Sequence, residues 1–87
     1  MNLVVLFAVL LASIVSYAGP KCTKEAKDKW QDQTAFQKKL ADEGYKIKKF
    51  KVTDGDCYEI YGWNKKGQRV EIYFNPITGE KVKEEIN

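Results

Sequence analysis

The sequence predicts an α+β domain in which one helix packs on a four-stranded antiparallel sheet, after an N-terminal signal peptide. Three observations support this prediction. An apolar stretch without charged residues precedes the polar remainder of the chain. Phe36 and Leu40 follow helical spacing, and from Tyr45 onward apolar and polar residues alternate as they do in strands. Because short turns separate the alternating segments, an antiparallel meander is the simplest topology.

The apolar run covers residues 3–12, and small residues follow at Ser16 and Ala18. Small residues at positions −3 and −1 predict signal peptidase cleavage before Gly19. The alternative is an uncleaved membrane anchor, but the run is shorter than the roughly 20 residues that a spanning helix needs. The predicted organisation is a signal peptide at 1–18, an N-terminal arm at 19–29 and a domain at 30–87.

Asp32 is a good N-cap residue for the predicted helix. Phe36 and Leu40 give this helix a narrow apolar stripe, and Gly44 suits its C-terminal end. We therefore expect one helix over about residues 33–43.

Four segments carry the alternation of strands, separated by turn residues. The doubled Lys48-Lys49 shifts the alternation and predicts a bulge in the first strand. Val82 is expected to bring a short edge strand into the core. The expected strands are 45–53, 57–64, 68–74 and 80–86. The expected core consists of Phe36, Leu40, Ile47, Phe50, Val52, Tyr58, Ile60, Val70, Ile72, Phe74 and Val82.

The two cysteines, Cys22 and Cys57, are expected to form a disulfide in an oxidising compartment. They are too far apart in sequence for the C-x-x-C spacing of a redox pair. A domain this small often needs such a covalent link for stability. The net charge of +3, with lysines and glutamates interleaved, does not indicate nucleic-acid binding.

The chain has no histidine, and its only serines, Ser13 and Ser16, lie in the predicted signal. These absences exclude Ser-His and Cys-His dyads and histidine metal sites from the predicted domain. No phosphate-binding glycine loop is present. We therefore predict a protein that is not an enzyme and that carries no cofactor and no metal.

Carboxylates leave two weaker alternatives. Glu59 and Glu71 share outward parity on neighbouring strands and could act as an acid/base pair. Cross-strand ion pairs in solvent are the favoured interpretation of this pair. Asp54 and Asp56 lie near Glu59 and could bind calcium, but ordinary turn chemistry accounts for them. The candidate ion-pair partners of the two glutamates are Lys49, Lys51 and Arg69.

Three aromatic residues, Tyr61, Trp63 and Tyr73, are expected on the sheet face that the helix leaves open. Amphipathic aromatics on an exposed face are typical of a partner-binding surface. The alternative is that the N-terminal arm, with Trp30, folds across this face and covers them. The covered arrangement is favoured because Cys57 would anchor the arm on that side.

The segment from Trp30 to Val82 resembles the PepSY domain family, in particular small, stand-alone, exported members from bacteria. Its most specific part is the turn Tyr73-Phe74-Asn75-Pro76-Ile77-Thr78-Gly79-Glu80, preceded by the strand Cys57-Tyr58-Glu59-Ile60-Tyr61. Phe36-x-x-x-Leu40, Gly44-Tyr45 and Gly67-x-Arg69-Val70-Glu71-Ile72 also match, and Asn75 replaces the usual Asp of the turn.

The resemblance implies a non-enzymatic binding module, periplasmic or secreted, whose protein partner is a peptidase that it inhibits, chaperones or modulates. No catalytic residues belong to the family pattern. The partner must act in trans, since no peptidase follows in this chain, and no stable membrane association is expected after cleavage. The alternative is a structural protein that self-assembles through its sheet edge or aromatic face.

Overall fold

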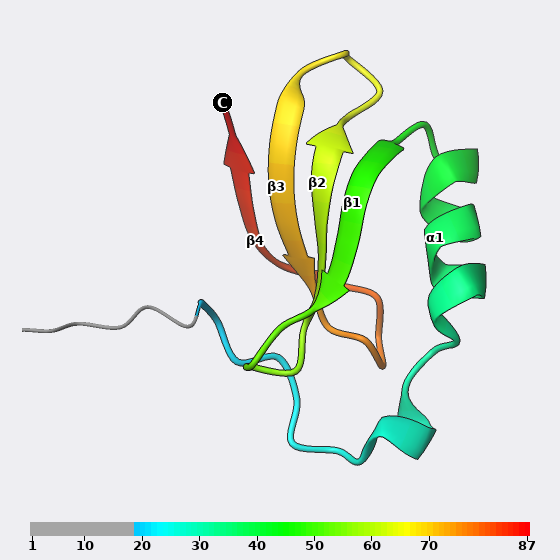
Figure 1. The fold of residues 1–87 in the computed structure, drawn as a ribbon, viewed down its shortest axis with the longest axis vertical. Helices are drawn as coiled ribbons and strands as arrows, with labels where there is room; N and C mark the ends of the chain where they lie inside the picture. Colours follow the sequence, from blue (N-terminus) through cyan, green and yellow to red (C-terminus); the bar gives the residue numbers. More distant parts are fainter. Residues whose placement is uncertain (1–18) are drawn as a thin grey trace, which may run out of the picture.

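The computed structural model describes residues 19–87, so the predicted signal and its cleavage site lie largely outside the described residues. Figure 1 shows a helix beside a sheet. No helix among residues 19–87 has the length and apolar character needed to cross a membrane. The elements are η2 (Lys27–Lys29), α1 (Gln33–Asp42), β1 (Lys46–Val52), β2 (Tyr58–Trp63), β3 (Arg69–Phe74) and β4 (Lys81–Ile86).

The sheet is an antiparallel meander with the strand order β1-β2-β3-β4, which confirms the predicted fold class and topology. The register of β1 against β2 shifts between Ile47 and Lys49, where the doubled lysine predicts a bulge. A second shift lies between Tyr73 and Phe74 in the pairing of β3 with β4.

The helix begins and ends as its capping residues predict. The backbone N–H of Ala35 donates to Oδ2 of Asp32 at 2.9 Å, which satisfies one free N–H of the first turn. At the other end Gly44 has φ 107°, a conformation that glycine adopts without steric cost. Between these caps, Phe36 and Leu40 are the two buried residues of the helix.

The core lies between α1 and the sheet. The ring of Phe36 packs 5.0 Å from that of Tyr58 and 5.2 Å from that of Phe74, measured between centroids. Ile47, Phe50 and Val52 pack at the margin of this core and are partly buried. The buried members are Phe36, Leu40, Tyr58, Ile60, Val70, Ile72 and Phe74.

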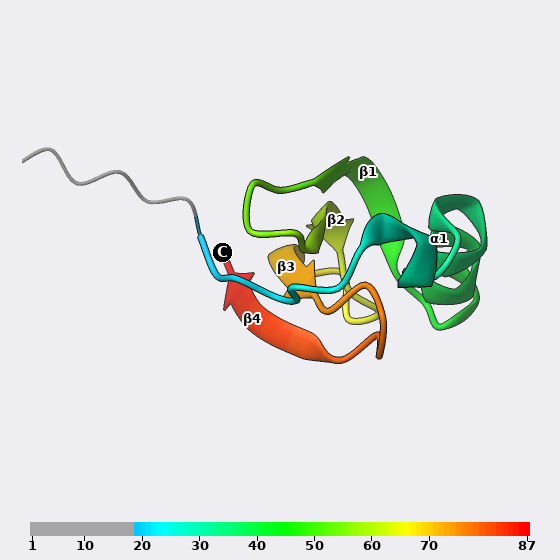
Figure 2. The same ribbon diagram turned by 90° about the horizontal axis from the view of Figure 1, so that it is seen from below.

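The expectation that Val82 joins the core is wrong, because its side chain is 45% exposed. The backbone of the helix approaches that of β1, and it does not approach that of β4. Figure 2 shows the reason, since α1 lies beside β1 while β4 lies at the far edge of the sheet. A single helix about 10–12 Å wide covers two or three strands spaced about 4.8 Å apart, which leaves the fourth strand uncovered.

The predicted disulfide between Cys22 and Cys57 is present, with the two Cα atoms 5.0 Å apart. It fixes the N-terminal arm to the end of the sheet at which β2 begins (Figure 1). Two hydrogen bonds hold the same point: the N–H of Cys22 donates to the carbonyl of Gly55 at 2.9 Å, and Nδ2 of Asn75 donates to the carbonyl of Cys22 at 3.0 Å. Arm and sheet therefore form one packed unit.

Trp30 packs on the helix side of the sheet. Its ring meets that of Tyr58 edge-on at 5.6 Å, and Nε1 donates to the carbonyl of Glu25 at 3.1 Å. The expectation that Trp30 covers the opposite sheet face is therefore wrong, because the aromatic core offers this ring a closer-packed position.

Candidate functional site

The candidate site lies on the face of the sheet opposite α1, here called the open face. Strand residues alternate between the two faces, so residues next to the core positions Tyr58 and Ile60 point away from the helix. Strand pairing arranges most of the side chains of the open face in two rows. One row is Lys51, Glu59, Tyr73 and Lys83, and the other is Lys49, Tyr61, Glu71 and Glu85.

Glu59 is the buried polar residue of this face, with only 1% of the residue exposed. Its Oε1 atom lies 3.8 Å from Nζ of Lys51, at the long end of ion-pair distances. Its Oε2 atom has no hydrogen-bond partner. Leaving a buried polar atom unpartnered typically costs about 1–3 kcal/mol, and more for a charged group. The expected solvated pairing is therefore wrong for Glu59, although the predicted contact with Lys51 exists.

Other predicted ion-pair partners are placed differently. Nζ of Lys49 lies over the ring of Tyr61, 5.9 Å from its centroid, in a cation–π arrangement. Arg69 is exposed and pairs across the strands with Trp63. Lys51 is thus the predicted cation that the structure brings to Glu59.

Glu71 accepts a hydrogen bond from the hydroxyl of Tyr73 at 3.0 Å. Burial raises the pKa of Glu59, and the adjacent Glu71 carboxyl raises it further. Hydrogen bonding to the Glu59 carboxyl, when that group carries a proton, lowers the pKa of Glu71, and the hydroxyls of Tyr61 and Tyr73 act in the same direction. A proton held by this pair therefore resides on Glu59.

The tyrosines of the face respond to the same two carboxylates. Hydrogen bonding to Glu71 raises the pKa of Tyr61, and burial followed by bonding to Glu71 raises that of Tyr73. Both tyrosines therefore remain neutral hydrogen-bond donors at physiological pH.

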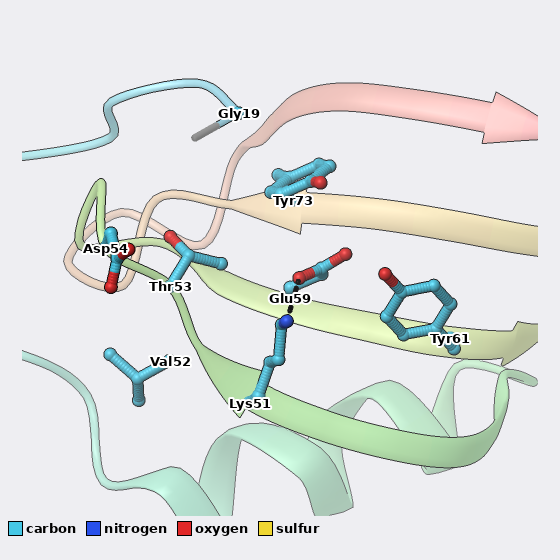
Figure 3. A pocket seen from close by; sticks show the side chains of 8 residues that line it. All are labelled: Gly19, Lys51, Val52, Thr53, Asp54, Glu59, Tyr61 and Tyr73. Atoms are coloured by element: carbon cyan, nitrogen blue, oxygen red, sulfur yellow. Dashed lines mark ion pairs between the residues drawn. The ribbon is translucent and has the colours of Figure 1, made fainter. Parts of the chain in front are cut away.

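A pocket of about 340 Å³ opens beside Glu59. Figure 3 shows the Glu59 carboxylate between the Lys51 ammonium and the rings of Tyr61 and Tyr73. Gly19 borders the pocket at Tyr73, and a Cβ added at this glycine would lie 3.2 Å from the ring. The lining consists of Gly19, Lys51, Val52, Thr53, Asp54, Glu59, Tyr61 and Tyr73.

The three aromatics singled out in the sequence all lie on the open face and are half-buried. The arm reaches this face at Tyr73, through Gly19. Tyr61 and Trp63 border a second, smaller pocket of about 140 Å³ that lies farther along β2. The arm therefore meets one end of the aromatic surface, and Trp63 lies toward the other.

The aspartates between β1 and β2 have turn roles. The N–H of Asp56 donates to the carbonyl of Thr53 at 3.0 Å, and Asp56 itself has φ 61°. Within the described part of the chain, no three acidic, cysteine or histidine side chains gather as a metal site would require. The structure thus gives the calcium alternative no support at Asp54, Asp56 and Glu59.

Sequence reasoning missed two features of the site: the burial of Glu59 and the position of Gly19 at the pocket. Alternation along β2 gives the face on which Glu59 lies but not its depth. The flanking residues Tyr58 and Ile60, both fully buried, could have indicated the burial of Glu59, since they place β2 in the centre of the sheet, where neighbouring strands shield both faces.

Comparison with known protein families identifies a relative of this chain. The family described as "Peptidase propeptide and YPEB domain" matches residues 2–85. No curated protein and no solved structure gives a significant match. Because the family match spans nearly the whole chain and agrees with the observed helix and sheet, the chain belongs to the PepSY_2 family of peptidase propeptide and YPEB domains.

Proposed function

We propose that this protein is an exported, non-enzymatic binding module that inhibits or modulates peptidases in the periplasm or outside the cell. Family membership carries this proposal, because the family is described as a peptidase propeptide domain. The disulfide between Cys22 and Cys57 fits an oxidising compartment, where such bonds persist. Both observations support a protein partner outside the cytoplasm.

The open face is the proposed contact surface. Tyr61, Trp63 and Tyr73 are half-buried there, and the helix packs on the opposite face. Tyrosine and tryptophan combine large apolar area with a polar group, and they are enriched among residues that dominate binding energies. A partner that docks on this face would contact all three, together with the lysines that flank them.

Peptidase assays test this proposal. The protein, expressed from its full sequence and exported by a bacterial host, is added at micromolar concentration to secreted and periplasmic peptidases of that host. We expect a changed cleavage rate for at least one of them, and loss of the effect in Trp63→Ala and Tyr61→Ala. Tyr45→Ala is the control, because Tyr45 packs against the core on the helix side. If every peptidase keeps its rate, the proposal fails.

Self-assembly through the sheet edge is the second candidate function. All residues of β4 are exposed, including Val82 and Ile86, which is 53% exposed. Exposed apolar residues on an edge strand favour pairing with another strand, whereas the Lys and Glu residues of β4 oppose it. Sedimentation velocity separates the two candidates, since concentration-dependent association that Val82→Lys abolishes would favour assembly.

A further inference from the structure

We propose that the pocket around Glu59 binds an alkylammonium group, supplied by a lysine side chain of the protein partner. The proposal rests on the proposed function only for the source of this lysine. The pocket itself is defined by the structure, and its volume of about 340 Å³ lies at the lower end of the range for ligand sites, roughly 300–1,000 Å³.

The Glu59 carboxylate has hydrogen-bonding capacity that its neighbours do not use. Its side chain is buried, its Oε2 atom lacks a hydrogen-bond partner, and the carboxylate points into the pocket (Figure 3). Lys51 is only a partial partner, because its side chain is 49% exposed and its Nζ lies 3.8 Å from Oε1. Glu71 lies against this carboxyl and shares a proton with it. An entering cation that displaces this proton would find a strong acceptor in the buried carboxylate.

Carboxyl groups outnumber cations around the pocket. Asp54 and Glu59 line the pocket with Lys51, and cleavage before Gly19 would add the α-ammonium group of that residue as a second cation. Glu71 lies beside Glu59 and adds a further carboxylate. The nearby lysines have other partners, since Lys83 pairs with Glu85 at 3.4 Å and Lys49 lies over Tyr61. The pocket therefore has room for one more positive charge.

The geometry favours an ammonium over a guanidinium group. Arginine binds carboxylates best through both oxygens at once, but Oε1 of Glu59 already faces Lys51. A compact ammonium needs only Oε2. The rings of Tyr61 and Tyr73 already attract cations, since Nζ of Lys49 and Nζ of Lys83 each lie 5.9 Å from the respective ring centroid. A divalent metal is disfavoured, because no cluster of three suitable ligands exists among residues 19–87.

A proton on Glu59 competes with the ligand, so binding should strengthen as pH rises. Burial raises the pKa of Glu59, and the ammonium ligand requires its charged form. A lysine ligand stays charged throughout this range. The titratable and charged groups around Glu59 are Lys49 and Lys51 of β1, Asp54 of the following turn, Tyr61 of β2, Glu71 and Tyr73 of β3, Lys83 and Glu85 of β4, and the α-amino group of Gly19 in a chain cleaved before that residue.

Ligand titration of the exported protein tests the proposal. N-acetyl-lysine methylamide is the probe, and N-acetyl-norleucine methylamide, of similar length but uncharged, is the matched control. We expect the lysine probe at millimolar concentration to shift the carboxyl carbon resonance of Glu59 and the ring resonances of Tyr61 and Tyr73. The norleucine probe should shift neither. Equal shifts with both probes, or none with the lysine probe, would overturn the proposal.

Glu59→Gln keeps the shape of the side chain and removes its charge, so it should weaken binding of the lysine probe at least about tenfold. Glu80→Gln is the control, because Glu80 is exposed and does not line the pocket. If Glu59→Gln does not fold, the pH dependence of the wild-type protein decides instead. Affinity that stays constant as Glu59 titrates would then contradict the proposal.

Two further outcomes are informative. If the α-amino group of a chain that begins at Gly19 already occupies the pocket, the lysine probe will not bind until that amine is acetylated, and the partner-lysine proposal is wrong. If the lysine probe binds but no peptidase is affected, the pocket stands and the proposed function fails. If Glu59→Gln still affects the peptidase, the proposed function stands, but the pocket does not take part in it.

Discussion

Removing the disulfide should cost this domain a large part of its stability. The bond joins positions 35 residues apart, and the loop that it closes contains η2, α1 and β1. In the chain-entropy model, closing a loop of this length stabilises the folded state by about 4 kcal/mol. For a domain of this size, that loss corresponds to a decrease in melting temperature of roughly 15–30 °C.

The measurement compares the wild-type protein with a Cys22→Ser, Cys57→Ala double variant by thermal and urea unfolding. Alanine is chosen at Cys57 because that side chain is fully buried, and burying a serine hydroxyl would add a separate cost. Reductant should lower the melting temperature of the wild-type protein and leave that of the variant unchanged.

A melting temperature that changes by only a few degrees would refute the reasoning. It would mean that the arm detaches locally, without involving the core. The structure argues against such detachment, because Trp30 follows the arm directly and packs against the buried Tyr58.

Four substitutions test the packing and burial of individual residues. Gly62→Ala should destabilise the domain by about 1–3 kcal/mol or more, because the added Cβ would lie 1.9 Å from the carbonyl oxygen of Lys46. Gly67→Ala should cost only about 1 kcal/mol, since its φ of 78° is unfavourable but nothing lies near the added Cβ; urea unfolding compares the two variants. Phe36→Ala should cost about 3–5 kcal/mol by the same measurement, because this side chain joins the helix to the sheet core, and a loss below 1 kcal/mol would contradict that role. Burial raises the pKa of Glu59 above its usual 4.5, so the contribution of Glu59 to stability is complete below that pH and is lost as pH rises through the folded-state pKa. Melting curves between about pH 4 and 8 should therefore show that Glu59→Gln becomes more stable relative to the wild-type protein as pH rises. A difference that stays constant with pH would contradict this.

Local patterns in the sequence predicted most of the fold. The helix bounds differ from the prediction by one residue, because the signals that set them act within a few residues of the chain. These signals are the N-cap at Asp32, the apolar stripe of Phe36 and Leu40, and Gly44. The bulge near Lys48 follows from the same short-range reasoning, since it is a break in alternation. Such features need no knowledge of distant parts of the chain.

Tertiary packing decided what the sequence could not. Val82 has the alternation of a core residue, yet it remains exposed because the single helix lies over β1. Trp30 was expected on the open face, but it packs against Tyr58 on the other side. Both errors concern which element covers which part of the sheet, and this depends on the width and position of α1 rather than on the residues themselves.

The burial of Glu59 links these packing effects to the proposed function. Its depth arises from neighbours on two adjacent strands, Lys51 and Tyr73, and from the arm, which brings Gly19 beside Tyr73. Burying a carboxylate without a full set of partners destabilises a small domain, because the lost hydration is not replaced. A neutral glutamine would occupy the same space without a net charge to desolvate. If Glu59→Gln stabilises the protein and abolishes binding of the lysine probe, the carboxylate is maintained at the expense of stability, as expected of a binding residue.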